Sequence, residues 1–423
     1  APMAWASVLV AALAACAPAR GARLSEARPE AALLRDLDPR LATSALGLVP
    51  LPRVVSAPCS TPLLLWSSGE GAVLRLAPYD VEVGGVEWFP QGDRFVTSSG
   101  GWLDIWSVSG DRLQILAVEE GSGVEILAVK VFPAGDRLVS VGTDSVAVVW
   151  DARSGDAVQR LRLPGPHSVV RIFPDGLRIA TGCGISPGEP ALIWSIADAQ
   201  LLHALRLPET SAGDSLVVLL ELSPCGSKVV TSDAIRLGIW NADDGRLERH
   251  LDASGGPPLS LWLAWGGAHL VSCGYEARSV VYTPSIGRVT TQIIGEGQEI
   301  QACLILAGGD RVLVATDSGL FIADSRSGQV VYGLQDGAGG QVQQIAASPQ
   351  GDFVAACGLP HGVSGGGALP QQGAIWTKVW SASSGRLLHQ RDEPTARAVY
   401  HHQFSPGCIV AVSGAGTMAD LLR

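Results

Sequence analysis

The sequence predicts an all-β fold built from one repeated unit of short strands, and three observations lead to this prediction. The first is alternation, because Val146, Val148 and Trp150 fall on one side of an extended chain. The second is turn chemistry, because Pro-Ala-Gly-Asp precedes these strands and Ser-Gly-Asp follows them, as tight turns prefer. The third is repetition along most of the chain. A pair of short strands cannot bury its faces alone, so copies are expected.

The copies keep a regular spacing. A residue that ends the third strand of each unit returns at steps of about 40 to 46 residues, with one last step of about 57, close to the period of about 40 to 45 of four-stranded propeller blades. These residues are Trp66, Trp106, Trp150, Trp194, Trp240, Tyr282, Ala323 and Trp380. The longest step contains a Gly- and Pro-rich insertion from Cys357 to Ala374, which explains its length. The sequence therefore predicts a β-propeller.

These residues resemble those of the WD-repeat β-propellers. Trp150 and Asp151 match the signature dipeptide of that family, which becomes Trp-Ser or Trp-Asn in other repeats. An aspartate stands in the turn before the third strand of three repeats, at Asp144, Asp233 and Asp317. The Gly-His pair that opens a family repeat is missing almost everywhere, and His167 is its best remnant. The resemblance therefore implies that the Asp-His-Ser-Trp hydrogen-bond network of the family is incomplete in every blade.

The repeats divide the chain into an apolar, partly helical N-terminal extension over residues 1–48 and a propeller over residues 49–423. Seven complete sets of strands run from Val83 to Gln390, and part-sets remain at Arg53 to Leu76 and Val399 to Val412. Joining the part-sets would remove the free edges of an open ring. We therefore predict eight blades of four antiparallel strands, closed by N- and C-terminal strands. A seven-bladed ring, or a last strand that begins a second propeller, is the alternative.

The N-terminal extension has more than one interpretation. Met3 to Arg23 contains an apolar run of about 14 residues, within the range of the hydrophobic region of a secretory signal. Leu13 to Cys16 resembles a bacterial lipoprotein cleavage site, and an organelle transit peptide is a further alternative. No Lys or Arg precedes the apolar run, so the favoured expectation is an Ala-rich packing helix.

Composition restricts the partners. The formal net charge of −10 argues against a nucleic-acid or anionic-membrane surface, because those partners need a basic footprint. It also disfavours direct docking to the acidic tails of tubulin. The eight cysteines contain no C-x-x-C pair, so we expect buried reduced thiols, a reducing compartment and no zinc site. A cytoplasmic protein without membrane insertion is the main prediction, and export is the minor one.

No catalytic constellation emerges. His401 and His402 are adjacent on a strand, so their side chains point to opposite faces. One enzyme class stays as the alternative, because turns such as DARSGDAV at Asp151 are similar to the docking motif of eight-bladed quinone-dependent dehydrogenases. Those enzymes tend to carry a vicinal cysteine pair and an acidic calcium site, and neither stands out in this sequence. We predict no enzyme activity, no cofactor and no metal.

The predicted function is a non-catalytic scaffold for other proteins, because a propeller holds two faces of loops at fixed positions. Arg178 to Ser195 carries a long insertion between an ATG-ended strand and an I-x-W strand, which resembles EMAP-like and ciliary microtubule-associated WD-repeat proteins. That resemblance implies a cytoskeletal or ciliary assembly, with indirect contact to microtubules. The candidate partner-binding residues are His361, Trp376, Glu189 and Asp214.

Overall fold

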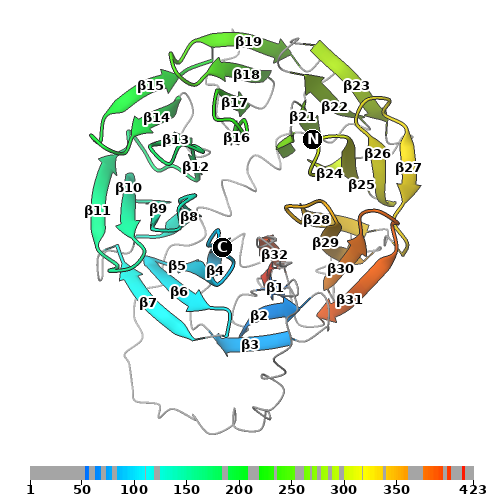
Figure 1. The fold of residues 1–423 in the computed structure, drawn as a ribbon, viewed down its shortest axis with the longest axis horizontal. Helices are drawn as coiled ribbons and strands as arrows, with labels where there is room; N and C mark the ends of the chain where they lie inside the picture. Colours follow the sequence, from blue (N-terminus) through cyan, green and yellow to red (C-terminus); the bar gives the residue numbers. More distant parts are fainter. Residues whose placement is uncertain are drawn as a thin grey trace, which may run out of the picture.

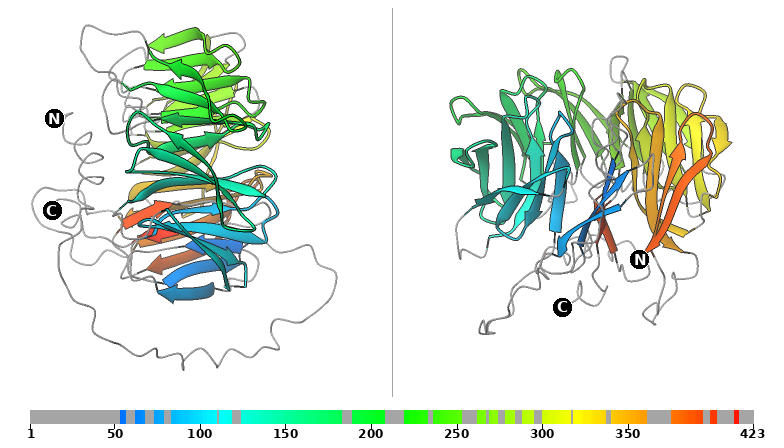
Figure 2. Two further views of the ribbon diagram at one scale, coloured as in Figure 1. Left: turned by 90° about the vertical axis from the view of Figure 1, so that its left-hand side faces the viewer. Right: turned by 60° about the horizontal axis from the view of Figure 1, so that its bottom comes forward.

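The structure is a computed structural model, and all the secondary-structure elements that it describes are β-strands. The described residues are 53–56, 62–67, 73–78, 83–109, 111–118, 124–182, 189–207, 219–232, 236–252, 262–266, 269–273, 278–283, 288–294, 300–316, 318–336, 340–360, 375–393, 398–401 and 412–414. They form an open-centred ring of radiating sheets (Figure 1), which Figure 2 shows from the side as a disc. The prediction of an all-β propeller is therefore confirmed.

Seven four-stranded sheets, numbered here as blades 1 to 7, follow one another along the chain. Blade 1 contains β4 (Val83–Trp88), β5 (Arg94–Ser99), β6 (Trp102–Ser107) and β7 (Arg112–Ala117). Blade 2 contains β8 (Ile126–Val131), β9 (Arg137–Gly142), β10 (Val146–Asp151) and β11 (Ala157–Arg162). Blade 3 contains β12 (Val169–Ile172), β13 (Arg178–Gly182), β14 (Ala191–Ser195) and β15 (Leu201–Leu205). Blade 4 contains β16 (Leu219–Leu222), β17 (Lys228–Ser232), β18 (Arg236–Asn241) and β19 (Leu247–Asp252).

The remaining three blades keep the same order. Blade 5 contains β20 (Trp262–Gly266), β21 (His269–Cys273), β22 (Arg278–Thr283) and β23 (Arg288–Ile294). Blade 6 contains β24 (Ile300–Ile305), β25 (Arg311–Thr316), β26 (Gly319–Asp324) and β27 (Val330–Gly333). Blade 7 contains β28 (Gly340–Ala347), β29 (Phe353–Pro360), β30 (Ile375–Ser381) and β31 (Leu387–Glu393). In each blade the first strand lies toward the centre of the ring and the fourth lies on its rim (Figure 1).

The expected eighth blade does not form one hydrogen-bonded sheet in the described part of the chain. Between blades 7 and 1 lie a three-stranded sheet and a two-stranded sheet. The first contains β1 (Arg53–Ser56), β2 (Pro62–Ser67) and β3 (Val73–Pro78), and the second contains β32 (Ala398–His401) and β33 (Val412–Gly414). β32 contacts the inner strands β28 and β4, and β33 contacts β1. The predicted helical segment within residues 1–48 lies outside the described residues.

The turn between the first and second strands explains why the repeat has its sequence. In blade 2 the amide of Phe132 donates to the carbonyl of Arg137 at 2.9 Å. The amide of Gly135 donates to the carbonyl of Phe132 at 2.8 Å. Gly135 has a φ of 72°, which favours glycine. The guanidinium of Arg137 stacks on the ring of Phe132 at 4.6 Å and donates to the carbonyl of Gly176 in blade 3 at 3.3 Å. The repeated turn therefore also ties neighbouring blades together.

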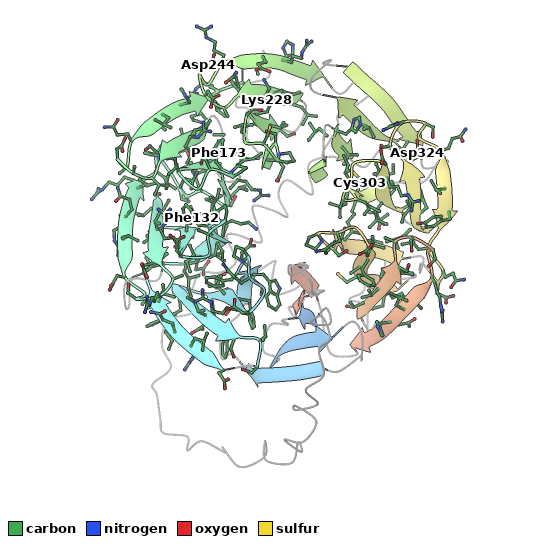
Figure 3. All side chains as sticks on the ribbon, viewed as in Figure 1. Phe132, Phe173, Lys228, Asp244, Cys303 and Asp324 are labelled. Carbon is green, nitrogen blue, oxygen red and sulfur yellow. The ribbon has the colours of Figure 1, made fainter. Side chains whose placement is uncertain are left out.

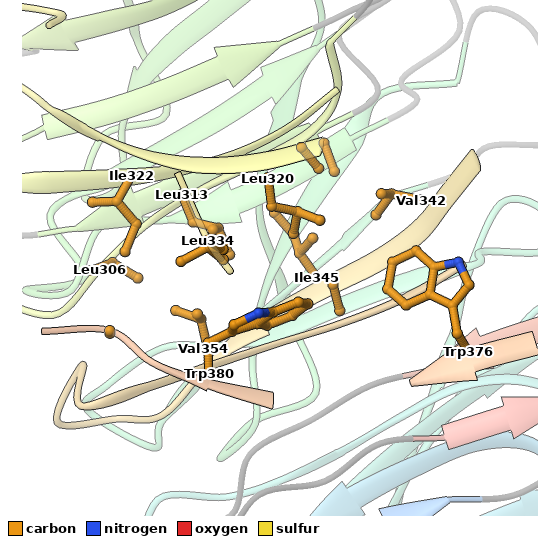
Figure 4. Packing of buried hydrophobic residues seen from close by; sticks show 14 residues of the cluster. Leu306, Leu313, Leu320, Ile322, Leu334, Val342, Ile345, Val354, Trp376 and Trp380 are labelled. Atoms are coloured by element: carbon orange, nitrogen blue, oxygen red, sulfur yellow. The ribbon is translucent and has the colours of Figure 1, made fainter. Parts of the chain in front are cut away.

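The hydrophobic core is divided into layers between neighbouring blades. One layer contains Phe89 and Leu103 of blade 1 together with Val148 and Trp150 of blade 2. Phe132 and Phe173 lie at corresponding places further along the ring (Figure 3). Figure 4 shows the layer between blades 6 and 7, where Trp380 is fully buried beside Val354 and Leu334. Each blade therefore buries its faces only against its neighbours, as a repeat architecture requires.

Candidate functional site

Two ends of the ring carry different connections. We call the loop face the end where the second strand joins the third and the fourth strand joins the next blade. The best described loop-face cluster belongs to blade 3 and contains Gly165 and His167 before β12, and Glu189 before β14. The strand that follows Glu189, β14, is fixed by the buried side chain of Trp194, whose indole N–H donates to Thr181 Oγ1 at 3.3 Å. Two loops that are separate in sequence therefore meet above one anchored strand.

His167 and Glu189 form the contact between these loops. His167 is fully buried, and its Nε2 lies 3.8 Å from Glu189 Oε2. A Cβ on residue 165 would lie 2.6 Å from Glu189 Oε1, so the carboxylate occupies space that only a glycine leaves open. The glycine therefore permits the approach of the acid to the imidazole.

The contact between His167 and Glu189 is not a hydrogen bond. Both ring nitrogens of His167 and Oε2 of Glu189 are buried without a hydrogen-bond partner among the described residues. Burial in an apolar environment lowers the pKa of His167 to about 4. The imidazole is therefore neutral at neutral pH, and it holds the loop by packing rather than as a salt bridge.

The indole anchor of Trp194 is repeated in four consecutive blades. The indole N–H of the third strand donates to a buried hydroxyl on the second strand at 3.0 Å for Trp106 and Thr97, 2.9 Å for Trp150 and Ser140, and 2.8 Å for Trp240 and Thr231. In blade 7 the corresponding position is Ala356, and Trp380 donates instead to the carbonyl of Gln335 at 2.7 Å. The third strand is therefore fixed in nearly the same way around much of the ring.

The aspartates of the repeat have local roles. Asp144 accepts from the amide of Val146 at 3.2 Å. Asp151 accepts from the amides of Ser154 at 2.7 Å and Arg153 at 2.8 Å, and these bonds lower the pKa of its carboxyl. The Asp-x-x-Ser-Gly pattern is thus explained by turn geometry alone.

The four predicted partner-binding residues are not brought together among the residues whose placement is known. Glu189 lies in the loop-face cluster of blade 3, with 24% of its side chain exposed. Trp376 lies in β30 of blade 7, across the ring, and is only 4% exposed, so it is not displayed on a loop (Figure 1). His361 and Asp214 lie outside the described residues, as do Asp233 and Asp317. Trp66 belongs to β2.

Several features escaped the sequence analysis. Trp102 begins β6 at the loop face and is 41% exposed, although the turn Gly100–Gly101 before it was visible in the sequence. Asp104 and Lys378 are buried charged residues on third strands. The prediction of buried thiols holds for Cys303 and Cys357 but is wrong for Cys225, which is exposed in the turn after Pro224.

The described residues contain no group of three or more His, Cys, Asp or Glu side chains that could hold a metal ion. Within the same residues there is no helix of the length and apolarity needed to cross a membrane. No family model matches the chain.

Proposed function

We propose that this protein is a non-catalytic scaffold that binds other proteins through its loop face, on a ring of the WD-repeat type. The observation that supports this most is the repeated anchoring of the third strand by a buried indole in blades 1 to 4. A frame fixed in this way holds its loops in position before binding, so that little conformational entropy is lost when a partner binds. The acidic net charge favours protein partners over nucleic acids.

The cellular setting is also a proposal. The insertion in RIATGCGISPGEPALIWS, from Arg178 to Ser195, supports a cytoplasmic protein of a cytoskeletal or ciliary assembly. Within that segment Glu189 gives the insertion of blade 3 a fixed end, because it packs against His167 of the preceding loop. With a net charge of −10, contact to microtubules would be made through another protein.

The partner-binding role of the blade 7 insertion can be tested by replacing residues 361–372 with a short Gly-Ser turn. Leu359 and Pro360 must be kept, because they pair with Gln341 and Gly340 in the sheet. We expect an almost unchanged melting temperature and reduced capture of at least one native partner, measured by co-purification and mass spectrometry. A variant with the same residues in scrambled order is the control for loop length. Unchanged capture would remove this loop from the proposed surface.

Closure by both ends of the chain is a further part of the proposal. β32 lies against β28 and β4, as a first strand between blades 7 and 1 would, and β33 lies against β1. We infer that β32 and β33 and the sheet β1–β3 together act as an eighth blade. Such closure protects edges that would otherwise be free to pair with other chains.

Removal of residues 405–423 tests this closure. The deletion takes away β33, so we expect the thermal midpoint to fall by about 5 °C or more. Removal of residues 415–423 alone leaves β33 in place and is the matched control. Equal midpoints for the two deletions, measured by circular dichroism, would mean that the ring closes without β33.

A further inference from the structure

The interface between blades 6 and 7 contains a buried ammonium group that forms no ion pair with any carboxylate among the described residues. Lys378 lies in β30 and is 6% exposed. Its Nζ donates to the backbone carbonyl of Asp336 at 2.6 Å and lies 5.6 Å from the centre of the Trp376 ring. No acidic side chain in the described part of the structure forms an ion pair with it. Lysine is almost never buried to this extent unless its charge is compensated.

The same position on the third strand is apolar in blades 2 to 4, whereas blade 1 has a buried acid, Asp104, there. Val148 in blade 2 and Leu192 in blade 3 occupy it, each packed in the layer against the preceding blade. Gly238 occupies it in blade 4, where Leu207 of the preceding blade fills the space. Lys378 therefore replaces a core residue with a cation, which the packing of the ring does not require.

A second unused donor lies on the same side of β30. Trp376 precedes Lys378 by two residues, so both side chains leave the same face of the strand. Trp376 is 4% exposed, and its indole N–H has no hydrogen-bond partner among the described residues. On β29 the residues opposite these two large side chains are Gly358 and Ala356, which occupy little volume. The two donors thus leave the same face of the strand, and their cross-strand neighbours on β29 are small.

The ammonium of Lys378 lies next to an exposed turn. The carbonyl that accepts from Lys378 belongs to Asp336, which is exposed and has a φ of 49° in the left-handed region. The adjacent Gln335 is exposed too, and its carbonyl accepts from Trp380. The ammonium is therefore bound to a turn whose residues Gln335 and Asp336 are exposed.

We propose that Lys378 and Trp376 form a binding site for a carboxylate carried by a partner protein, at the junction of blades 6 and 7. The ammonium supplies the charge and the indole supplies a second hydrogen-bond donor, which together suit a carboxylate better than a neutral acceptor. One part of this proposal rests on the proposed scaffold function, namely that the carboxylate belongs to a partner protein. Binding of a simple carboxylate tests the site without any partner.

The test uses the full chain with its tryptophan indoles labelled with ¹⁵N and titrated with acetate against chloride at constant ionic strength. Trp376→Phe identifies the indole signal of Trp376 in the spectrum. We expect this signal to shift in a saturable way with acetate, and Lys378→Met to weaken acetate binding by about tenfold or more. The indole signals of Trp150 and Trp240 serve as internal controls for an intact fold, and they should keep their positions in Lys378→Met.

Two results would overturn the carboxylate site itself. One is a Trp376 signal that does not respond to acetate, or that responds equally in Lys378→Met. The other is a signal that moves in Asp392→Asn while acetate has no effect, because Asp392 pairs with Trp376 by register and its own carboxylate would then fill the site. If Lys378→Met loses acetate binding but still captures its partners as well as the unmodified protein does, the site binds small carboxylates only. That result would contradict the proposal that the carboxylate belongs to a partner protein.

Discussion

Trp150→Ala is expected to lower the free energy of unfolding by about 3–5 kcal/mol, the usual range for emptying a large buried site. The side chain of Trp150 is 2% exposed and packs in the layer that joins blades 1 and 2. Its indole N–H also donates to Ser140 Oγ at 2.9 Å inside the core. The substitution therefore removes both the contact between two blades and the hydrogen bond that fixes the third strand. Urea unfolding followed by fluorescence measures the loss.

Trp102→Ala is the matched control, because Trp102 is 41% exposed at the start of the third strand of the neighbouring blade. We expect it to cost less than about 1 kcal/mol, as is usual for surface positions. Trp150→Phe separates the two parts of the effect, since it keeps most of the packing and leaves the buried hydroxyl of Ser140 without its donor, at a cost of about 1–3 kcal/mol. Equal losses for Trp150→Ala and Trp102→Ala would contradict the layered core.

The repeat could be predicted from the sequence because its signals are local. The Pro-Ala-Gly-Asp turn needs a glycine at the positive φ of Gly135, and the alternation before Trp150 follows from the pleat of a strand. The seven complete sets of strands predicted between Val83 and Gln390 are all present as four-stranded sheets. These features depend on a few neighbouring residues, so they leave a clear pattern in the chain.

The burial of particular side chains could not be predicted in the same way. Strand periodicity tells which residues share a face, but the depth of that face depends on the next blade, which comes about 40 residues away in sequence. Trp376 was therefore a candidate for contact with a partner, and it is buried between blades. Cys225 was expected in the core, although the turn that contains Gly226, with its φ of 72°, exposes it.

The closure of the ring and the cluster at His167 show a second limit. Both depend on segments that are brought together only by the complete fold. His167 was visible in the sequence as a remnant of a family pattern. Its distance to Glu189, however, depends on a second loop, the one that joins β13 to β14. The sequence therefore pointed to His167, but it did not predict that both ring nitrogens would be buried without a hydrogen-bond partner among the described residues.

The burial of His167 gives this residue a measurable effect on stability. Its pKa in the folded protein is lowered to about 4 by burial, whereas an unfolded histidine has a pKa of about 6.5. Between about pH 6.5 and about pH 4 the histidine is protonated in the unfolded chain but stays neutral in the folded protein. The contribution of the neutral His167 to stability is therefore complete above about pH 6.5 and is lost as the pH falls toward about 4. Linkage gives a loss of about 2 kcal/mol between pH 7.5 and pH 5, and of about 3 kcal/mol in total.

His167→Asn should remove this loss, even if it lowers stability at every pH, because asparagine does not titrate. The expected result is therefore a smaller difference between urea unfolding at pH 7.5 and pH 5 for this variant than for the unmodified protein, by about 2 kcal/mol. His203→Asn is the control, since His203 lies on an outer strand with Nε2 within 2.9 Å of the exposed carbonyl of Asp243. In a direct measurement, the NMR signal of the His167 ring should not titrate between pH 7.5 and pH 5. A ring that titrates near pH 6.5 or above would mean that Glu189 pairs with the imidazolium in solution, and that the two loops are held by charge instead of packing.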